Sequence, residues 1–110
     1  MLTDIEQLRT LFKELKRILE KENDNETLYI IDQSELSLHL IDDCLKSTYK
    51  NEDLKQLFNK LEEIYTKINQ PRVGLSDYFI WRDNYEERIK VNNELDAIKR
   101  NLTLVFRKYK

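Results

Sequence analysis

Apolar residues recur along most of this chain in steps of three and four, which is the period of an α-helix that buries one face. The first such stripe predicts a helix that begins with a capping box at residues 3–6, a threonine followed three positions later by a glutamate. Short amide and carboxylate side chains at residues 23–25 are expected to end this helix. Its predicted buried face comprises Ile5, Leu8, Phe12, Leu15 and Leu19.

Two further stripes predict a second and a third helix. The second helix is expected from residue 26 or 27 to about residue 49, with Leu28 in its main stripe. Its apolar positions spread widely around the axis, which favours a helix covered on more than one side. The third stripe is the most regular and predicts a helix over residues 51–69, capped by its first asparagine and stopped by Pro71.

The only glycine, proline and tryptophan of the chain fall within residues 71–81. After this loop a serine and an aspartate are expected to cap a short aromatic helix over residues 76–91, with an extended piece at residues 78–81 as the alternative. An asparagine at position 92 or 93 is expected to restart the chain as a final helix that reaches residue 109.

These stripes together predict an all-α fold. The expected architecture is one domain over residues 1–110, an antiparallel helical bundle of four main helices plus a shorter aromatic-rich helix. One glycine and one proline in 110 residues agree with this expectation, because a sheet protein needs many turns.

The single cysteine, Cys44, excludes an internal disulfide and suits a reducing compartment. The first residues lack the basic start and apolar run of a secretory signal, and no stretch is as apolar and as long as a membrane span. A cytoplasmic protein that does not enter a membrane is therefore expected.

Charge is spread unevenly along the chain although its formal net value is only −2. Residues 20–43 carry eight carboxylates and one lysine, whereas residues 99–110 carry five cations and no carboxylate. The two segments are expected either to attract each other as solvated helix faces or to leave the acidic one available to a basic partner.

No known catalytic motif is present. His39 lies near Glu35 on its helix, but a lone histidine cannot supply the ligand set of a metal-binding bundle. Cys44 has neither an activating base nor a second cysteine in a CxxC spacing, so burial is favoured over a nucleophilic role. Adjacent carboxylate pairs on a helix point about 100° apart and do not flank one substrate bond. No catalytic residue, metal or cofactor is expected, and nothing supports an enzyme.

A cationic tail with aromatic residues, as at residues 99–110, is also found in nucleic-acid-binding proteins. Phe106 and Tyr109, however, continue the apolar stripe of the last helix, and a sequence pI near 5.5 lacks the broad basic footprint of such proteins. No nucleic-acid partner is expected.

The aromatic segment is the better candidate for function. Tyr78, Phe79, Trp81 and Tyr85 cannot all face the same way on one helix, so either two sides are covered or some rings remain accessible. Accessible rings beside carboxylates would suit a basic protein partner, whereas enclosed rings would plug the end of the bundle. The candidate partner-binding residues are Asp77, Tyr78, Phe79, Trp81, Asp83, Tyr85 and Glu86, with Asp32, Glu35 and Asp42 from the acidic segment.

The run Pro71-Arg72-Val73-Gly74-Leu75-Ser76-Asp77-Tyr78-Phe79-Ile80-Trp81, and the aromatic and acidic residues after it to position 95, resemble the C-terminal portion of small helical immunity proteins of bacterial polymorphic-toxin systems. The resemblance implies a non-enzymatic cytoplasmic protein that binds one cognate toxin domain. It implies no catalytic residue and does not identify the toxin.

The sequence thus favours a helical inhibitor that occludes a basic, nucleic-acid-cleaving or other toxin domain. The alternative is a structural or regulatory bundle that uses the same patch to form a homodimer.

Overall fold

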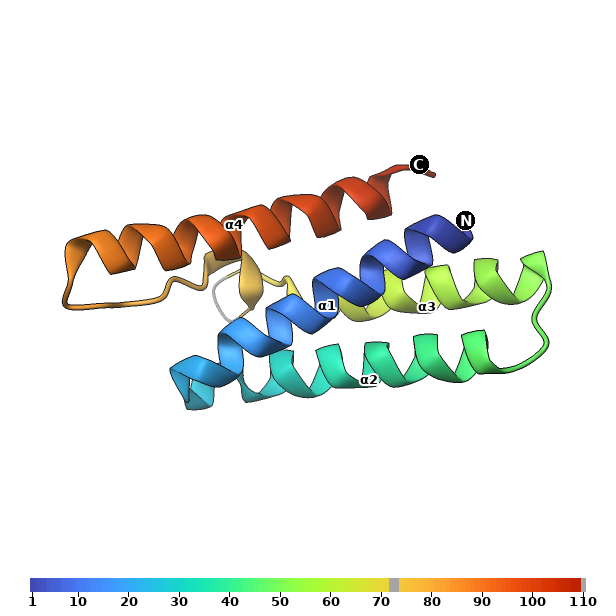
Figure 1. Ribbon diagram of the computed structural model, residues 1–110, viewed down its shortest axis with the longest axis horizontal. Helices are drawn as coiled ribbons and strands as arrows, with labels where there is room; N and C mark the ends of the chain where they lie inside the picture. Colours follow the sequence, from blue (N-terminus) through green and yellow to red (C-terminus); the bar gives the residue numbers. More distant parts are fainter. Residues whose placement is uncertain (72–73, 110) are drawn as a thin grey trace.

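Four α-helices run antiparallel in chain order in the computed structural model, which describes residues 1–71 and 74–109 (Figure 1). No strand occurs in these residues, so the all-α prediction and its four main helices are confirmed. The helices are α1 (Leu2–Glu22), α2 (Leu28–Lys46), α3 (Asn51–Ile68) and α4 (Tyr85–Arg107), with short 3-10 turns η1 (Asn25–Thr27) and η2 (Leu75–Asp77).

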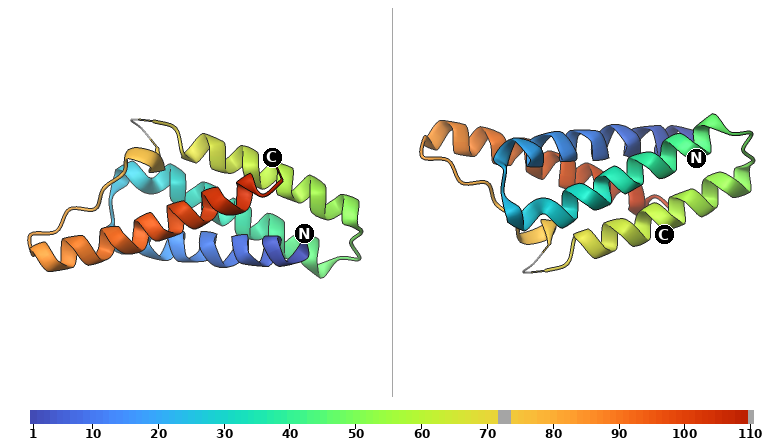
Figure 2. Two further views of the ribbon diagram at one scale, coloured as in Figure 1. Left: turned by 90° about the horizontal axis from the view of Figure 1, so that it is seen from above. Right: turned by 90° about the horizontal axis from the view of Figure 1, so that it is seen from below.

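Helix α1 is the centre of the bundle, because it packs against α2, α3 and α4 (Figures 1 and 2). Its predicted apolar stripe is confirmed, since every member is fully buried. Phe12 is the largest of these side chains, and burial of one such ring contributes about 2–3 kcal/mol to the free energy of unfolding. The regular stripe of α3 is buried in the same core.

Helix α2 is less covered than the sequence predicts. Helix α2 packs against both α1 and α3, as expected for a helix covered on more than one side, but Leu28 and Leu36 remain exposed. The face turned to the core instead includes two small residues, Ser34 and Ser37. Each buried hydroxyl donates to the carbonyl four residues earlier, which satisfies it without a partner from another helix.

Several helices begin or end at other residues than predicted. The capping box at residues 3–6 does not form, because α1 already starts at Leu2 with Met1 as its cap. Asn23 ends α1 in a left-handed conformation (φ 51°), as its residue type predicts. Helix α2 ends at Lys46, three residues early, and α3 is capped by Lys50, whose amide donates to Asp53 Oδ2 at 2.8 Å.

The predicted aromatic helix over residues 76–91 is wrong for residues 76–84, whereas residues 85–91 are helical as the first part of α4. Before α4 only the short turn η2 forms, and residues 78–84 are extended or bent, which agrees with the alternative of an extended piece at residues 78–81. The side-chain Oδ1 of Asn84 caps α4 by accepting from Glu87 N at 3.0 Å, so the helix starts at Tyr85 and continues past Asn92 without a break. Figure 1 shows the start of α4 projecting beyond the ends of the other helices.

The C-terminal tail makes hydrogen bonds with the start of α1 and not with the acidic segment at residues 20–43. Lys108 Nζ lies 2.7 Å from Asp4 Oδ1, and the hydroxyl of Tyr109 also donates to this buried carboxylate. Phe106 is buried and stacks on Tyr65, with ring centroids 5.2 Å apart, which continues the apolar stripe as predicted. Lys108 therefore pairs with Asp4 at the N-terminal end of α1 and not, as expected for the cationic tail, with residues 20–43.

No helix in the described part of the chain combines the length and the apolar content needed to cross a membrane.

Candidate functional site

The segment that links η2 to α4 alternates between the core and solvent. Ile80 is buried and its neighbours Phe79 and Trp81 are exposed, with 58% and 66% of their surfaces accessible. Tyr78 and Arg82 are half-buried on the inner side. This alternation is that of an extended chain with one face turned inward, and it places two large rings on the surface.

Asn92 holds the inner edge of this segment. Its side-chain Oδ1 accepts from Ile80 N at 2.9 Å, and its Nδ2 donates to Ile80 O at 2.7 Å and to Arg88 O at 2.9 Å. The side chain thus satisfies the buried backbone of Ile80 as a neighbouring strand would. The residue expected to cap a helix instead fixes the extended segment to the middle of α4.

Arg82 fixes the far end of the segment to α1. Its guanidinium makes two hydrogen bonds with the Glu22 carboxylate, at 2.7 and 2.6 Å, and only 7% of the Glu22 side chain is exposed. Such a two-point contact fixes direction as well as distance.

Tyr78 fixes the end of the segment that follows η2. Its hydroxyl donates to Asp24 Oδ2 at 3.1 Å, and its carbonyl accepts from Lys99 Nζ at 3.0 Å. Burial, and then the nearby Asp24 carboxylate, raise the pKa of Tyr78. Burial lowers the pKa of Lys99, although the carboxylates of Asp96 and Asp77 oppose this effect. Four side chains therefore hold a segment that has no regular structure of its own.

Arg88 covers one side of the exposed rings. Its guanidinium carbon lies 4.4 Å from the centroid of Trp81 and 5.3 Å from that of Tyr85, within the range of cation–π attraction. Trp81 Nε1 donates to Asp83 Oδ1 at 3.3 Å. The rings are thus oriented by neighbours and yet remain open to solvent.

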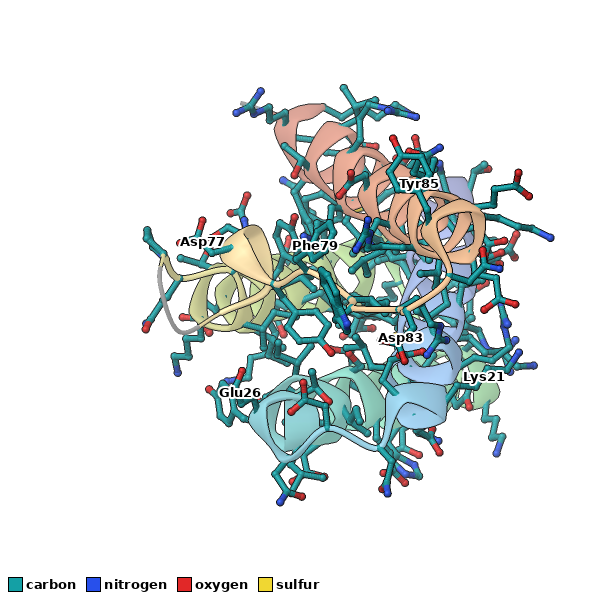
Figure 3. All side chains as sticks on the ribbon, turned by 90° about the vertical axis from the view of Figure 1, so that its left-hand side faces the viewer. Lys21, Glu26, Asp77, Phe79, Asp83 and Tyr85 are labelled. Atoms are coloured by element: carbon teal, nitrogen blue, oxygen red, sulfur yellow. The ribbon has the colours of Figure 1, made fainter. Side chains whose placement is uncertain are left out.

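A cleft of about 520 Å³ lies beside Phe79, between η1 and η2. Three carboxylates line it, and no basic side chain among the described residues does so. Figure 3, which looks onto this end of the bundle, places Phe79 between Asp77 on one side and Tyr85 and Asp83 on the other, with Glu26 on the far side of the cleft. The lining residues are Asp24, Glu26, Ile30, Gly74, Asp77, Tyr78 and Phe79.

Gly74 lets the chain close this side of the cleft. A β-carbon at this position would lie 2.5 Å from the carbonyl oxygen of Gln70 and 2.6 Å from that of Ile68. Because both are backbone atoms, no larger residue fits without moving the chain.

We name the surface formed by Glu26, Asp77, Phe79, Trp81, Asp83, Tyr85 and Glu86 the end face. Of the predicted partner-binding residues, the structure brings together here the exposed members of the aromatic segment. Tyr78 differs, because its ring is turned inward and its hydroxyl is bound to Asp24.

The predicted residues of α2 do not join this cluster as a group. Asp32 and Glu35 are exposed on α2, where Glu35 lies 3.7 Å from His39. Asp42 is about 15 Å further along the helix than Asp32 and is paired with Arg9 at 2.8 Å. The Arg9 guanidinium lowers the pKa of Asp42, so this carboxylate already has a cation.

Three contributors to this region were not among the predicted partner-binding residues, namely Asp24, Glu26 and Arg88. Asp24 and Glu26 were predicted only as members of the acidic segment, and Asp24 also as part of the helix stop, because the bond from the distant Tyr78 hydroxyl has no signal in the sequence. Arg88 lies three residues after Tyr85, a spacing that places two side chains on one helix face and could have indicated the contact.

The two candidate reactive groups both lie on α2. His39 is exposed on α2, and Cys44 is half-buried, where burial raises the pKa of its thiol. Within residues 1–71 and 74–109 no group of three or more histidine, cysteine, aspartate or glutamate side chains is placed to hold a metal ion.

Comparisons of the chain with models of protein families, with curated proteins and with solved structures gave no significant match.

Proposed function

We propose that this protein is a non-enzymatic binding module that recognises a basic protein partner through the end face. The single observation that carries the proposal is that three large rings are exposed side by side, Phe79 and Trp81 on a segment that four side-chain contacts hold in place and Tyr85 at the start of α4. Their exposed fractions are 58%, 66% and 64%. Large rings on a fixed support lose little conformational freedom on binding, which is typical of the residues that dominate interface energies.

The charge around the rings favours a cationic partner. Asp83 accepts a hydrogen bond from Trp81, Glu86 directly follows Tyr85 in α4, and the cleft next to Phe79 is lined by carboxylates. Acidic groups at the rim speed association with a basic surface and disfavour acidic proteins.

These features of the end face suit a protein that inhibits a toxin domain. A basic toxin that acts on nucleic acid binds phosphates, and carboxylates on the end face would compete for the same cations while the rings provide desolvated contact. The resemblance of residues 71–95 to immunity proteins motivates this assignment, which rests on the end face rather than on any relative.

The test is affinity capture from the source cells with the purified chain as bait, followed by identification of what is retained. The double variant Phe79→Ala, Trp81→Ala should lose the partner, with affinity reduced by at least about 30-fold, because the loss of even one such ring is expected to cost about 2 kcal/mol. The matched control is Leu36→Ala, Leu104→Ala, which removes exposed apolar side chains from α2 and α4 outside the end face.

Equal retention of a basic partner by both double variants would contradict the proposal. Self-association is the competing use of the same rings, and sedimentation of the purified chain over a range of concentrations distinguishes it.

A further inference from the structure

The two segments of opposite charge do not meet within one copy of the chain. Among the described residues no ion pair joins residues 20–43 to residues 99–109. Helices α2 and α4, which carry most of the two segments, lie on opposite sides of the bundle (Figures 1 and 3). The attraction that the sequence predicts between them therefore has no place inside the monomer.

The outer side of α2 is acidic and also carries exposed apolar side chains. Its outward positions fall within about 100° of one another around the helix axis, and we name them the α2 face. They are Leu28, Asp32, Glu35, Leu36, His39 and Asp43. No lysine or arginine among the described residues pairs with these three carboxylates, and only Glu35 lies near a basic group, His39. The α2 face thus combines leucine side chains with uncompensated negative charge.

A groove runs between the second halves of α3 and α4. Two adjoining cavities of about 370 and 330 Å³ form it, and both are lined by Tyr65, Asn69, Thr103 and Arg107. Tyr65 is buried at the bottom, where its hydroxyl lies 2.9 Å from Thr103 Oγ1 and its ring stacks on Phe106. The two helices therefore touch through these side chains and leave a hollow above them.

The rim of this groove on α4 is cationic. Arg100 and Arg107 line it and are exposed, and their guanidinium groups have no hydrogen bond or ion pair within the described residues. Leu104 lies between them in the sequence and is also exposed. Glu62 is the one carboxylate among the described lining residues. The groove thus offers apolar surface beside two arginines that lack an acidic partner.

We propose that copies of this protein associate head to tail, with the α2 face of one copy docked in the groove between α3 and α4 of the next. The carboxylates of the α2 face meet Arg100 and Arg107, and the leucines of α2 cover the apolar surface beside Leu104. The spacing agrees, because Glu35 and Asp43 are about 12 Å apart along α2 and the two arginines about 10 Å apart along α4.

Charge complementarity identifies the occupant as a second copy. The same chain supplies both surfaces, and one contact covers exposed leucine side chains and unpaired charges of opposite sign on both sides. The contact joins two different patches, so it forms open chains or a closed ring rather than a symmetric dimer. Neither surface includes Phe79, Trp81 or Tyr85, so the association leaves these rings free and does not depend on the proposed function.

The experiment is sedimentation velocity of the full chain at micromolar to millimolar concentration and low salt. The wild type should form dimers and larger species as its concentration rises, and added salt should weaken them because the charges are exposed. The groove variant Arg100→Glu, Arg107→Glu and the α2 variant Asp32→Lys, Asp43→Lys should each associate at least about tenfold more weakly, since like charges then meet.

A mixture of the two charge-reversed variants gives the sharpest result. The reversed α2 face of one variant is complementary to the reversed groove of the other, so the equimolar mixture should regain the association that each variant lacks alone. Lys55→Glu, Lys60→Glu is the control, because it makes the same change in net charge at exposed positions of α3 outside the groove, and it should associate like the wild type. Circular dichroism checks that every variant keeps its helix content.

The outcomes separate this inference from the proposed function. Leu36→Ala, Leu104→Ala should lose self-association and keep a basic partner, whereas Phe79→Ala, Trp81→Ala should do the reverse. A wild type that stays monomeric at millimolar concentration, a mixture that stays monomeric, or self-association that is lost only with the Phe79 and Trp81 rings would overturn the head-to-tail contact. Retention of the captured basic partner by the variant without those rings rejects the proposed function and leaves this contact standing.

Discussion

Asn92 in the middle of α4 makes hydrogen bonds with both the N–H and the C=O of Ile80, at 2.9 and 2.7 Å. This contact keeps Ile80 in the core and thereby turns Phe79 and Trp81, its two neighbours, toward solvent. One buried amide thus determines which rings the protein displays.

Replacing Asn92 with alanine should destabilise the bundle. The change leaves the buried N–H of Ile80 without a partner, so we expect the free energy of unfolding to fall by about 1–3 kcal/mol, measured by urea denaturation. Asn93→Ala is the control, because Asn93 is the next residue of α4 and is exposed, and its effect should stay within about 0.5 kcal/mol. Equal effects of the two variants would show that the Ile80 contact contributes nothing.

The ion pair between Arg82 and Glu22 provides a second test. Arg82→Lys keeps the charge but loses the two-point contact with a carboxylate that is nearly buried, so we expect a loss of about 1–2 kcal/mol and faster amide exchange at residues 80–83.

Arg9→Lys is the matched control for that variant. The side chains of Arg9 and Asp42 are both well exposed, and their pair should be worth at most about 0.5 kcal/mol. If the two lysine variants were equally stable, Arg82 would not hold the segment.

The pair formed by Asp4 and Lys108 predicts a dependence of stability on pH. Hydrogen bonds from Lys108 and then Tyr109 lower the pKa of Asp4 below its usual value. A carboxyl group with a lowered pKa stabilises the folded state above its unfolded pKa of about 3.9, and this contribution is lost as the pH falls through the folded value. The midpoint of urea unfolding should therefore fall below about pH 4 in part because of Asp4.

Asp4→Asn should remove this part of the acid dependence and lower stability at neutral pH, because the buried position then lacks the charge that Lys108 faces. Asp43→Asn, at an exposed position of α2, is the control and should leave the acid dependence nearly unchanged. An acid limb of the same steepness in Asp4→Asn as in the wild type would contradict the assignment.

Trp81 is the only tryptophan, so its fluorescence reports on the end face directly. Arg88→Ala removes the guanidinium that covers the ring, and we expect quenching by acrylamide, a neutral quencher, to become more efficient. Lys90→Ala is the control, because Lys90 is a nearby exposed cation of α4 for which no contact with the ring is found within the described residues. The same quenching in both variants would mean that Arg88 does not cover Trp81 in solution.

The sequence predicted helices α1 and α3 well because their signals are local. The stripes of Ile5 to Leu19 and of α3 are each contained in one helix, and their burial needs only a neighbouring apolar face. The accessibility of Phe79 and Trp81 was foreseen only as one of two alternatives, because a list of aromatic residues does not say which of them faces the core.

Hydrophobic periodicity and turn-forming residues, both properties of near neighbours, determined the fold class and the four main helices. Only the tertiary structure decided the conformation of residues 78–84, because its fixed points come from elsewhere in the chain. Ile80 is held from 12 residues away, Tyr78 from 54 and Arg82 from 60. Local propensity favoured a helix there, and three distant polar contacts together outweighed it.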